Sequence, residues 1–149
     1  MDNFDETGPE TAEPLPVSSA RFSQARAAQS MAVLEDYAEM IDDLTQDLGE
    51  ARITDIAARM GVTHPTATKA VARLKREGLA MSRPYRGVFL TETGAALAAR
   101  VRARHRTVVD LLVAVGVPQE TAELDAEGLE HHVSEVTLHA FEAFLARRS

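Results

Sequence analysis

The sequence predicts a mainly α-helical protein with a small β-wing, in which an N-terminal winged helix-turn-helix domain precedes a second, helical domain. Three observations indicate this fold. Apolar residues recur at helical spacing along most of the chain. Glycines separate two short helical segments between residues 51 and 78. A basic loop then joins two short extended segments between residues 79 and 91. We expect the two domains to span residues 23–91 and 92–149.

Composition restricts the class of protein. The chain has 149 residues and no cysteine, so disulfides, thiolate metal sites and cysteine nucleophiles are excluded. No apolar run is long enough to cross a membrane, and the acidic N-terminus does not suit a secretory signal. We therefore expect a cytoplasmic protein with no membrane partner.

The chain is expected to begin with an arm and a long helix. Residues 1–22 are expected to be disordered, since this part is rich in Pro, Glu, Thr, Ser and Asp. The first helix is expected from Ser23 to Leu48, and Gly49 supplies its end. Its approximate apolar stripe consists of Met31, Leu34, Ala38, Ile41 and Leu48.

Residues 51–78 have the pattern of a helix-turn-helix. Thr54 is expected to cap the first helix and Gly61 to close it. Thr63 can cap the second helix, Pro65 fits its first turn, and Gly78 ends it. The apolar faces are Ile53, Ile56, Ala57 and Met60 on the first helix, and Ala67, Ala70, Val71 and Leu74 on the second.

The second helix presents a polar and basic outer face, and a hairpin with a basic tip follows it. Residues 79–84 and 88–91 flank Tyr85-Arg86-Gly87, which predicts a wing. An ordinary helical hairpin with incidental basic residues is the alternative, but turn, caps, pattern and charge agree on a winged helix-turn-helix. The residues expected along a DNA surface are Thr63, His64, Pro65, Thr66, Thr68, Lys69, Arg73, Arg76, Arg83 and Arg86.

The distribution of charge indicates a polyanionic partner. The net charge is −7, yet residues 51–90 contain eight basic and only two acidic residues. Residues 31–50 contain seven acidic residues and no basic one, and residues 116–149 have a net charge of −5. A basic block between acidic ones predicts a module that binds double-stranded DNA, set in a body with another task.

A second long helix is expected over residues 92–115. Leu97, Val101, Val108 and Leu112 are approximately aligned along it. His105 lies on the same apolar side. A single histidine there is more often a hydrogen-bonded core residue than a metal ligand, so both interpretations stay open.

The segment Asp125-Ala-Glu-Gly-Leu-Glu-His-His-Val133 indicates a metal site. On a helix, Glu127, Glu130 and His131 leave from one face, and His132 points elsewhere. Two carboxylates and one imidazole form an oxygen-rich ligand set for a divalent cation. A solvated acidic face is the alternative, and it applies equally to the pair Asp36 and Glu39.

With these features in place, the chain resembles the diphtheria-toxin-repressor-like regulators, in their manganese-transport-regulator branch. The resemblance runs from about Met31 to about Phe144. The residues that carry it are Leu34-Glu-Asp-Tyr-Ala-Glu39, the helix-turn-helix, Tyr85-Arg-Gly-Val-Phe-Leu-Thr91, Arg104-His105 and Asp125-Ala-Glu-Gly-Leu-Glu-His-His-Val-Ser134.

The resemblance implies a cytoplasmic homodimeric repressor, activated by Mn²⁺, that binds operator DNA and controls manganese uptake. It implies that residues 92–149 form the dimerisation and metal-binding domain. It also implies one or two Mn²⁺ per subunit, with Fe²⁺ or other divalent metals possible, and neither enzymatic activity nor a small-molecule substrate. The implied metal ligands are Asp36, Glu39, His105, Glu127, Glu130 and His131.

Two departures from the wider family bear on the metal and on the domains. Iron-responsive members have softer sulfur ligands where this chain has Asp36 and Glu127, and carboxylates suit the harder Mn²⁺. We also expect no C-terminal SH3-like domain after Ser149. The alternatives are a winged-helix regulator that senses iron or an organic ligand, and a metalloenzyme, which would need an open coordination position and a general base.

Overall fold

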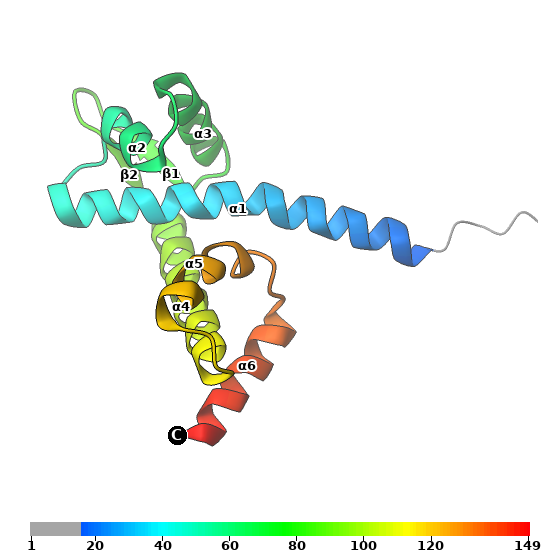
Figure 1. The fold of residues 1–149 in the computed structure, drawn as a ribbon. Helices are drawn as coiled ribbons and strands as arrows, with labels where there is room; N and C mark the ends of the chain where they lie inside the picture. Colours follow the sequence, from blue (N-terminus) through cyan, green and yellow to red (C-terminus); the bar gives the residue numbers. More distant parts are fainter. Residues whose placement is uncertain (1–15) are drawn as a thin grey trace, which may run out of the picture.

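The computed structural model describes residues 16–149, and the expected disorder of residues 1–15 lies outside that range. Within it, the chain forms six helices and two strands (Figure 1). In chain order these are α1 (Pro16–Leu48), α2 (Ile53–Met60), α3 (His64–Arg76), β1 (Ala80–Ser82), β2 (Val88–Leu90), α4 (Glu92–Ala114), α5 (Gln119–Leu129) and α6 (Glu135–Arg148).

Helix α1 divides the molecule. In Figure 1 the short helices α2 and α3 and the two strands lie on one side of α1, and α4, α5 and α6 lie on the other. Helix α4 begins beside the strands, crosses α1 and provides the surface against which α5 and α6 pack. Because α1 contacts both α2–α3 and α4, it connects the two parts of the fold.

The first helix begins at Pro16, so the expectation that the arm extends to residue 22 is wrong for residues 16–22. Proline suits a helical first turn, and residues 17–31 contain neither glycine nor a further proline. Extending an existing helix needs no new nucleus. The packed part of α1 therefore provides the nucleus for this polar stretch.

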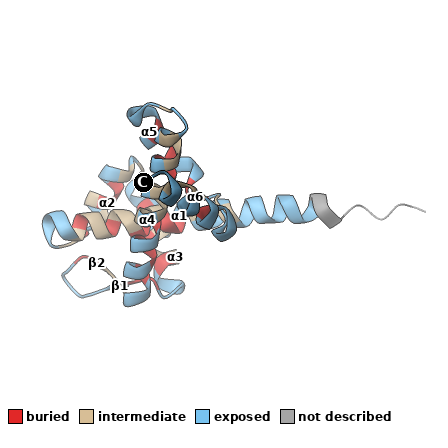
Figure 2. Cartoon of the chain, turned by 90° about the horizontal axis from the view of Figure 1, so that it is seen from below, coloured by how far each residue is buried: buried red, intermediate tan, exposed pale blue. Residues whose placement is uncertain are grey.

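The core of the N-terminal domain forms around the middle of α1. Leu34, Ala38 and Ile41 of the expected stripe are buried, and Tyr37 and Leu44 join them. Met31 and Leu48 are 42% and 58% exposed, so the prediction was wrong for both ends of the stripe. Figure 2 shows the reason, since α1 projects past the helices that cover its middle.

The helix-turn-helix forms largely as expected. Gly61 closes α2 in the left-handed conformation, with φ 68°. The Thr63 hydroxyl caps α3 by accepting a hydrogen bond from the Thr66 backbone N–H at 3.3 Å. The expected cap at Thr54 is wrong, because Thr54 lies inside α2, and the N-cap residue Arg52 makes no side-chain capping bond.

The wing is a two-stranded antiparallel sheet. Met81 pairs with Phe89 at its centre, and Ala51 adds an isolated bridge to Val88. Tyr85 at the tip has φ 60°, a left-handed conformation that non-glycine residues seldom adopt, and its side chain is fully exposed. The turn therefore presents Tyr85 and Arg86 to solvent.

A second, smaller core holds the C-terminal helices together. Val108 and Val109 of α4 pack against Ala122 and Ala126 of α5. Helix α5 ends at Leu129, so Glu130 and His131, which were expected on a helix with Glu127, lie just beyond its end; residues 130–132 form a turn before Ser134 caps α6. Within the described residues, no helix is long and apolar enough to cross a membrane.

Candidate metal centre and nucleic-acid interface

Three parts of the chain supply the six expected metal ligands. Asp36 and Glu39 lie in the buried middle of α1, and His105 lies on α4. Glu127 is in the last turn of α5, and the two remaining residues, Glu130 and His131, lie in the turn that follows. The ligand set thus joins the helix that supports the helix-turn-helix to the C-terminal helices.

Five of these residues form two clusters that share one carboxylate. Asp36, Glu130 and His131 make the first cluster, and His105, Glu127 and Glu130 make the second. In each cluster the candidate ligand atoms lie within 4.8 Å of one another. The shared residue Glu130 is fully buried, which places one acidic group between two groups of potential ligands.

Each imidazole has one nitrogen toward its cluster and the other toward a further carboxylate. His105 Nδ1 lies 2.6 Å from Glu130 Oε2, and its Nε2 lies 2.8 Å from Glu123 Oε2. His131 Nε2 lies 2.9 Å from Asp36 Oδ1, and its Nδ1 lies 3.4 Å from Glu35 Oε2. A carboxylate behind the imidazole fixes the ring and its tautomer in metal sites.

Polar atoms in the first cluster are buried without a hydrogen-bond partner among the described residues. They are Glu130 Oε1 and His131 Nε2. The approach of His131 Nε2 to Asp36 is short enough for an ion pair, but its direction does not make a hydrogen bond. Buried polar atoms that lack partners are uncommon. Nitrogen and oxygen donors with this geometry fit a divalent cation.

The pKa values in this site are shifted toward protonation. Burial raises the pKa of Glu130 from 4.5 to about 7, although its hydrogen bond with His105 opposes the rise. Burial also raises the pKa of Glu39, and the charge of Glu127 adds to it. Without a cation, the site therefore disfavours full ionisation of its carboxyl groups.

The two histidines shift in the direction of the charged imidazolium. The Asp36 carboxylate raises the pKa of His131, against the effect of burial. Burial lowers the pKa of His105, but hydrogen bonds with Glu123 and Glu130 outweigh it and the net shift is upward. In this state the histidines are partners of the carboxylates, and protons compete with any metal.

Glu39 belongs to neither cluster but lies in the cavity beside them. The cavity has a volume of about 350 Å³, and its lining residues come from α1, α2 and α5. They are Asp36, Glu39, Met40, Asp43, Arg59, Met60 and Glu127. Because Arg59 and Met60 belong to the helix-turn-helix, this cavity brings the DNA-binding domain to the edge of the candidate site.

Two supporting carboxylates were not found by sequence reasoning. Glu35 is 5% exposed, forms an ion pair with Arg104 of α4 and approaches His131. Glu123 of α5 supports His105. Only their adjacency to the expected ligands could have indicated them, since an acidic residue at a buried position has the same sequence signature as one on a solvated face.

The helical phase expected for the histidine pair is correct, although the helix ends earlier. His131 is 8% exposed, whereas His132 faces solvent. The turn after Leu129 continues in a helical conformation at Glu130, with φ −57° and ψ −30°, which keeps the side chains near their helical directions.

The start of α3 is an exposed polar surface suited to reading DNA. Thr63, His64, Pro65, Thr66 and Thr68 are all exposed there. Thr68 Oγ1 donates a hydrogen bond to the His64 carbonyl at 3.0 Å, and the Thr63 and Thr66 hydroxyls lie 2.9 Å apart. The N-terminal residues of a recognition helix reach base edges in DNA complexes.

The expected basic residues differ in their surroundings. Lys69 and Arg76 are exposed on α3. Arg73 shares their helical face but is half-buried: it donates hydrogen bonds to Ser30 Oγ at 2.7 Å and to the Ser30 carbonyl at 3.2 Å. Its side chain is thus directed toward α1, and its contact with DNA stays a prediction. On the wing, the guanidinium of Arg83 lies over the Phe89 ring, 5.1 Å from its centre.

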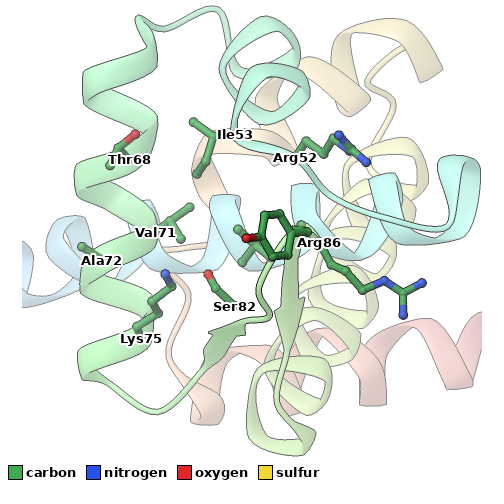
Figure 3. A pocket seen from close by; sticks show the side chains of 11 residues that line it. Arg52, Ile53, Thr68, Val71, Ala72, Lys75, Ser82 and Arg86 are labelled. Carbon is green, nitrogen blue, oxygen red and sulfur yellow. The ribbon is translucent and has the colours of Figure 1, made fainter.

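A cleft between α3 and the wing contains further basic residues that the sequence did not indicate. Its volume is about 530 Å³, and Figure 3 shows Lys75 and Thr68 on one wall and Arg52 and Arg86 at the opposite edge. Glu50 lies 3.2 Å from Arg52 and 3.3 Å from Arg86, so one carboxylate connects the start of α2 to the wing.

Comparison with known proteins agrees with this two-part arrangement. Residues 29–88 match the N-terminal DNA-binding domain of the iron-dependent repressors. Residues 91–149 match the metal-binding and dimerisation domain of the same family.

Curated relatives include transcriptional regulators named MntR. The protein from Escherichia coli O157:H7 is 50% identical over 123 residues, which are 83% of this chain and 79% of that protein. The protein from Salmonella typhimurium is 49% identical over 83% of this chain and 78% of its own length. The protein from Bacillus subtilis is 37% identical over 68% of this chain and 71% of its own length.

Solved structures of similar fold are also metal-dependent regulators. The manganese regulator SloR superposes with a TM-score of 0.67 at 30% identity, covering 76% of this chain. A manganese-dependent transcriptional repressor in complex with manganese has a TM-score of 0.66 at 28% identity, covering 74% of this chain. This chain spans about half of each of them, 53% and 51% respectively. With relatives at 50% identity over most of both chains, this chain belongs to the diphtheria-toxin-repressor-like family of iron-dependent repressors, in its MntR branch.

Proposed function

We propose that the protein is a cytoplasmic, manganese-responsive transcription repressor. It binds operator DNA as a homodimer when loaded with Mn²⁺ and controls manganese uptake. The observation that carries this proposal is the pair of ligand clusters that share the buried carboxylate of Glu130. Its family comprises transcriptional repressors, so the protein is not an enzyme.

The proposed ligands are carboxylate oxygens and imidazole nitrogens. Asp36, Glu130 and His131 would hold one Mn²⁺, and His105, Glu127 and Glu130 would hold a second, with Glu39 beside them. Hard oxygen donors suit Mn²⁺ better than softer, sulfur-preferring ions. The names of the MntR relatives and the manganese complex of a similar structure support the same metal.

Bound Mn²⁺ supplies positive charge that offsets the repulsion among the site's carboxylates. The protein's own residues determine how metal binding changes DNA binding. Asp36 and Glu39 are fixed on α1, whose buried residues Ala38, Ile41 and Leu44 pack in the core of the DNA-binding domain. The C-terminal ligands are fixed on α4, on α5 and in the turn that follows α5. A constraint between these two ligand groups therefore acts on the position of α3 relative to the dimerisation domain.

A dimer can use such a constraint to select the spacing of its recognition helices. Two helices must lie about 34–36 Å apart to enter successive major grooves on one face of DNA. Metal binding need only favour the conformation with that spacing over a conformation without it. The shift in this equilibrium equals the difference in metal-binding free energy between the two conformations. The exposed N-terminal part of α3 would then contact base edges, and Lys69, Arg76 and the wing would contact phosphates.

A ligand variant and a matched control test this proposal. Glu127→Ala removes one ligand and one charge at an exposed position, and we expect it to abolish Mn²⁺-dependent DNA binding while the dimer stays folded. Glu120→Ala removes the same charge from an exposed position at the start of α5 and should bind Mn²⁺ and DNA like the wild type. Mn²⁺ titration followed by calorimetry and by DNA-binding fluorescence anisotropy measures both. Equal behaviour of the two variants would contradict the site.

A further inference from the structure

The N-terminal third of α1 is a surface that the metal centre and the helix-turn-helix do not use. We call residues 19–30 of α1 the helical extension. Almost all its residues are exposed, and Figure 2 shows it projecting from the body as an uncovered helix. It would reach about 18 Å at a rise of about 1.5 Å per residue. The match to the DNA-binding domain of the family begins only at residue 29.

The helical extension differs in charge from the rest of the protein. Arg21 and Arg26 are its charged residues, and no acidic residue occurs between residues 14 and 34, in a chain with a net charge of −7. Serine and glutamine side chains accompany the two arginines. These are the side chains that usually contact phosphate and sugar oxygens in protein–DNA complexes.

The hydrogen bonds of Arg73 fix the direction of one face of this helix. Ser30 accepts both bonds from Arg73 of α3, so Ser30 lies on the side of α1 that faces the recognition helix. Ser19, Ser23 and Arg26 precede Ser30 by eleven, seven and four residues, spacings that place all of them on the same face. Arg21 precedes Ser30 by nine residues, a spacing that places it on the opposite face. Arg26 therefore continues the basic surface of α3 along α1.

We propose that the helical extension binds the phosphate backbone of duplex DNA that flanks the operator, beyond the base pairs contacted by α3. This inference rests on the proposed DNA-binding function. The occupant is DNA because the face carries Arg26 among serine hydroxyls, has no carboxylate and leads directly to the DNA-reading helix. The contact would add affinity without sequence preference, since phosphates carry no direct sequence information.

The test compares a duplex that covers only the operator with one extended by about ten base pairs, roughly one helical turn, at each end. The full-length wild type, with Mn²⁺, should bind the longer duplex more tightly and with a steeper dependence on salt. Arg26→Ala should bind the short duplex like the wild type and lose the gain from length. Alanine preserves helix propensity, so the variant keeps the helix.

The expected size of the effect follows from counterion release. One lost phosphate contact per subunit lowers the salt slope by about 1.8 per dimer, at about 0.9 per contact. On the long duplex, the ratio of wild-type to variant affinity should fall about tenfold between about 50 and 200 mM salt. Arg21→Ala removes the same charge from the opposite, exposed face of the same helix and should leave slope and affinity unchanged.

The outcomes separate this inference from the function on which it rests. Wild-type binding to the short duplex reports on the helix-turn-helix alone, and only the gain with length reports on the helical extension. A gain that persists in Arg26→Ala, or no gain in the wild type, overturns the inference. A change in dimer dissociation in sedimentation experiments, with an unchanged salt slope, would identify the extension as a subunit contact and also overturn it. Failure of the wild type to bind either duplex overturns both proposals.

Discussion

Replacing Glu130 by glutamine should make the metal-free protein more stable than the wild type and the protein in Mn²⁺ less stable than the wild type. The side chain is fully buried, and burial raises its pKa from 4.5 to about 7. In the metal-free protein its ionised form is therefore unfavourable. Glutamine has nearly the same shape and cannot ionise, so it removes this cost together with the ligand that both clusters share.

The sign of the pH dependence follows from the raised pKa. Below pH 4.5 the carboxyl group is protonated in both the folded and the unfolded protein and costs nothing. Between pH 4.5 and about 7 the unfolded chain loses its proton first, so stability falls as pH rises. The rise in pKa corresponds to about 3 kcal/mol. Glu130→Gln lacks this contribution and should gain up to about 3 kcal/mol over the wild type between pH 5 and 8.

The histidines keep part of the slope in the variant. The pKa values of His105 and His131 are raised in the folded protein, so their stabilising contribution is present below pH 6.5 and is lost as pH rises through their folded pKa values. Both contributions have the same sign as that of Glu130. The metal-free variant should therefore show a shallower decline of stability with pH, not a flat profile.

Urea unfolding in EDTA and in saturating Mn²⁺, from pH 5 to pH 8, measures both effects. In EDTA at pH 8 Glu130→Gln should be more stable than the wild type. In Mn²⁺ the order should reverse, because a ligand at about a thousand times its Kd stabilises the wild type by about 4.1 kcal/mol, which exceeds the variant's gain of about 3 kcal/mol. Glu142→Gln, on the exposed surface of α6, is the control and should follow the wild type. Parallel pH profiles for wild type and Glu130→Gln in EDTA would refute the reasoning.

The other predictions concern ligand geometry, metal choice and DNA. His131→Ala should abolish the response to Mn²⁺ in calorimetry, whereas His132→Ala should change it little, because His132 faces solvent. An equal loss in both variants would contradict the directions assigned to the two side chains. Asp36→Met replaces a hard carboxylate by a soft thioether and should shift activation from Mn²⁺ toward Fe²⁺ or Co²⁺, and an unchanged metal order would remove the argument from hardness. Arg86→Ala should weaken binding to all sequences and lower the salt slope by about one per phosphate contact, whereas Thr66→Ala should mainly reduce discrimination between operator and random DNA.

The local features of the fold were predictable because short-range chemistry decides them. Gly61 is needed where α2 ends in a left-handed residue, and the Thr63 hydroxyl caps α3 whatever lies further away. The start of α1 was not predictable in the same way. Its polar residues 16–22 have no apolar stripe, and their helical state depends on continuity with the packed part of the helix.

The candidate site was predictable as far as spacing and family resemblance reach. The helical phase of Glu130 and His131 follows from their positions in the chain, and both are buried as expected for ligands. The partners of the site were not predictable, because they depend on how helices pack. Arg73 turns to Ser30, and Glu123 turns to His105, only once α3 lies beside α1 and α5 beside α4.

The most direct test of the central claim is DNA binding by the full-length protein across matched Mn²⁺ and Fe²⁺ titrations. Fragments of the promoters that control manganese-uptake genes are the DNA, and anisotropy is recorded for wild type and Glu127→Ala at constant salt. The account predicts that Mn²⁺ raises the affinity of the wild type for such a fragment well above its affinity in EDTA. Fe²⁺ should do so less, and Glu127→Ala should respond to neither. Equal affinity of the wild type in EDTA and in Mn²⁺ would contradict it.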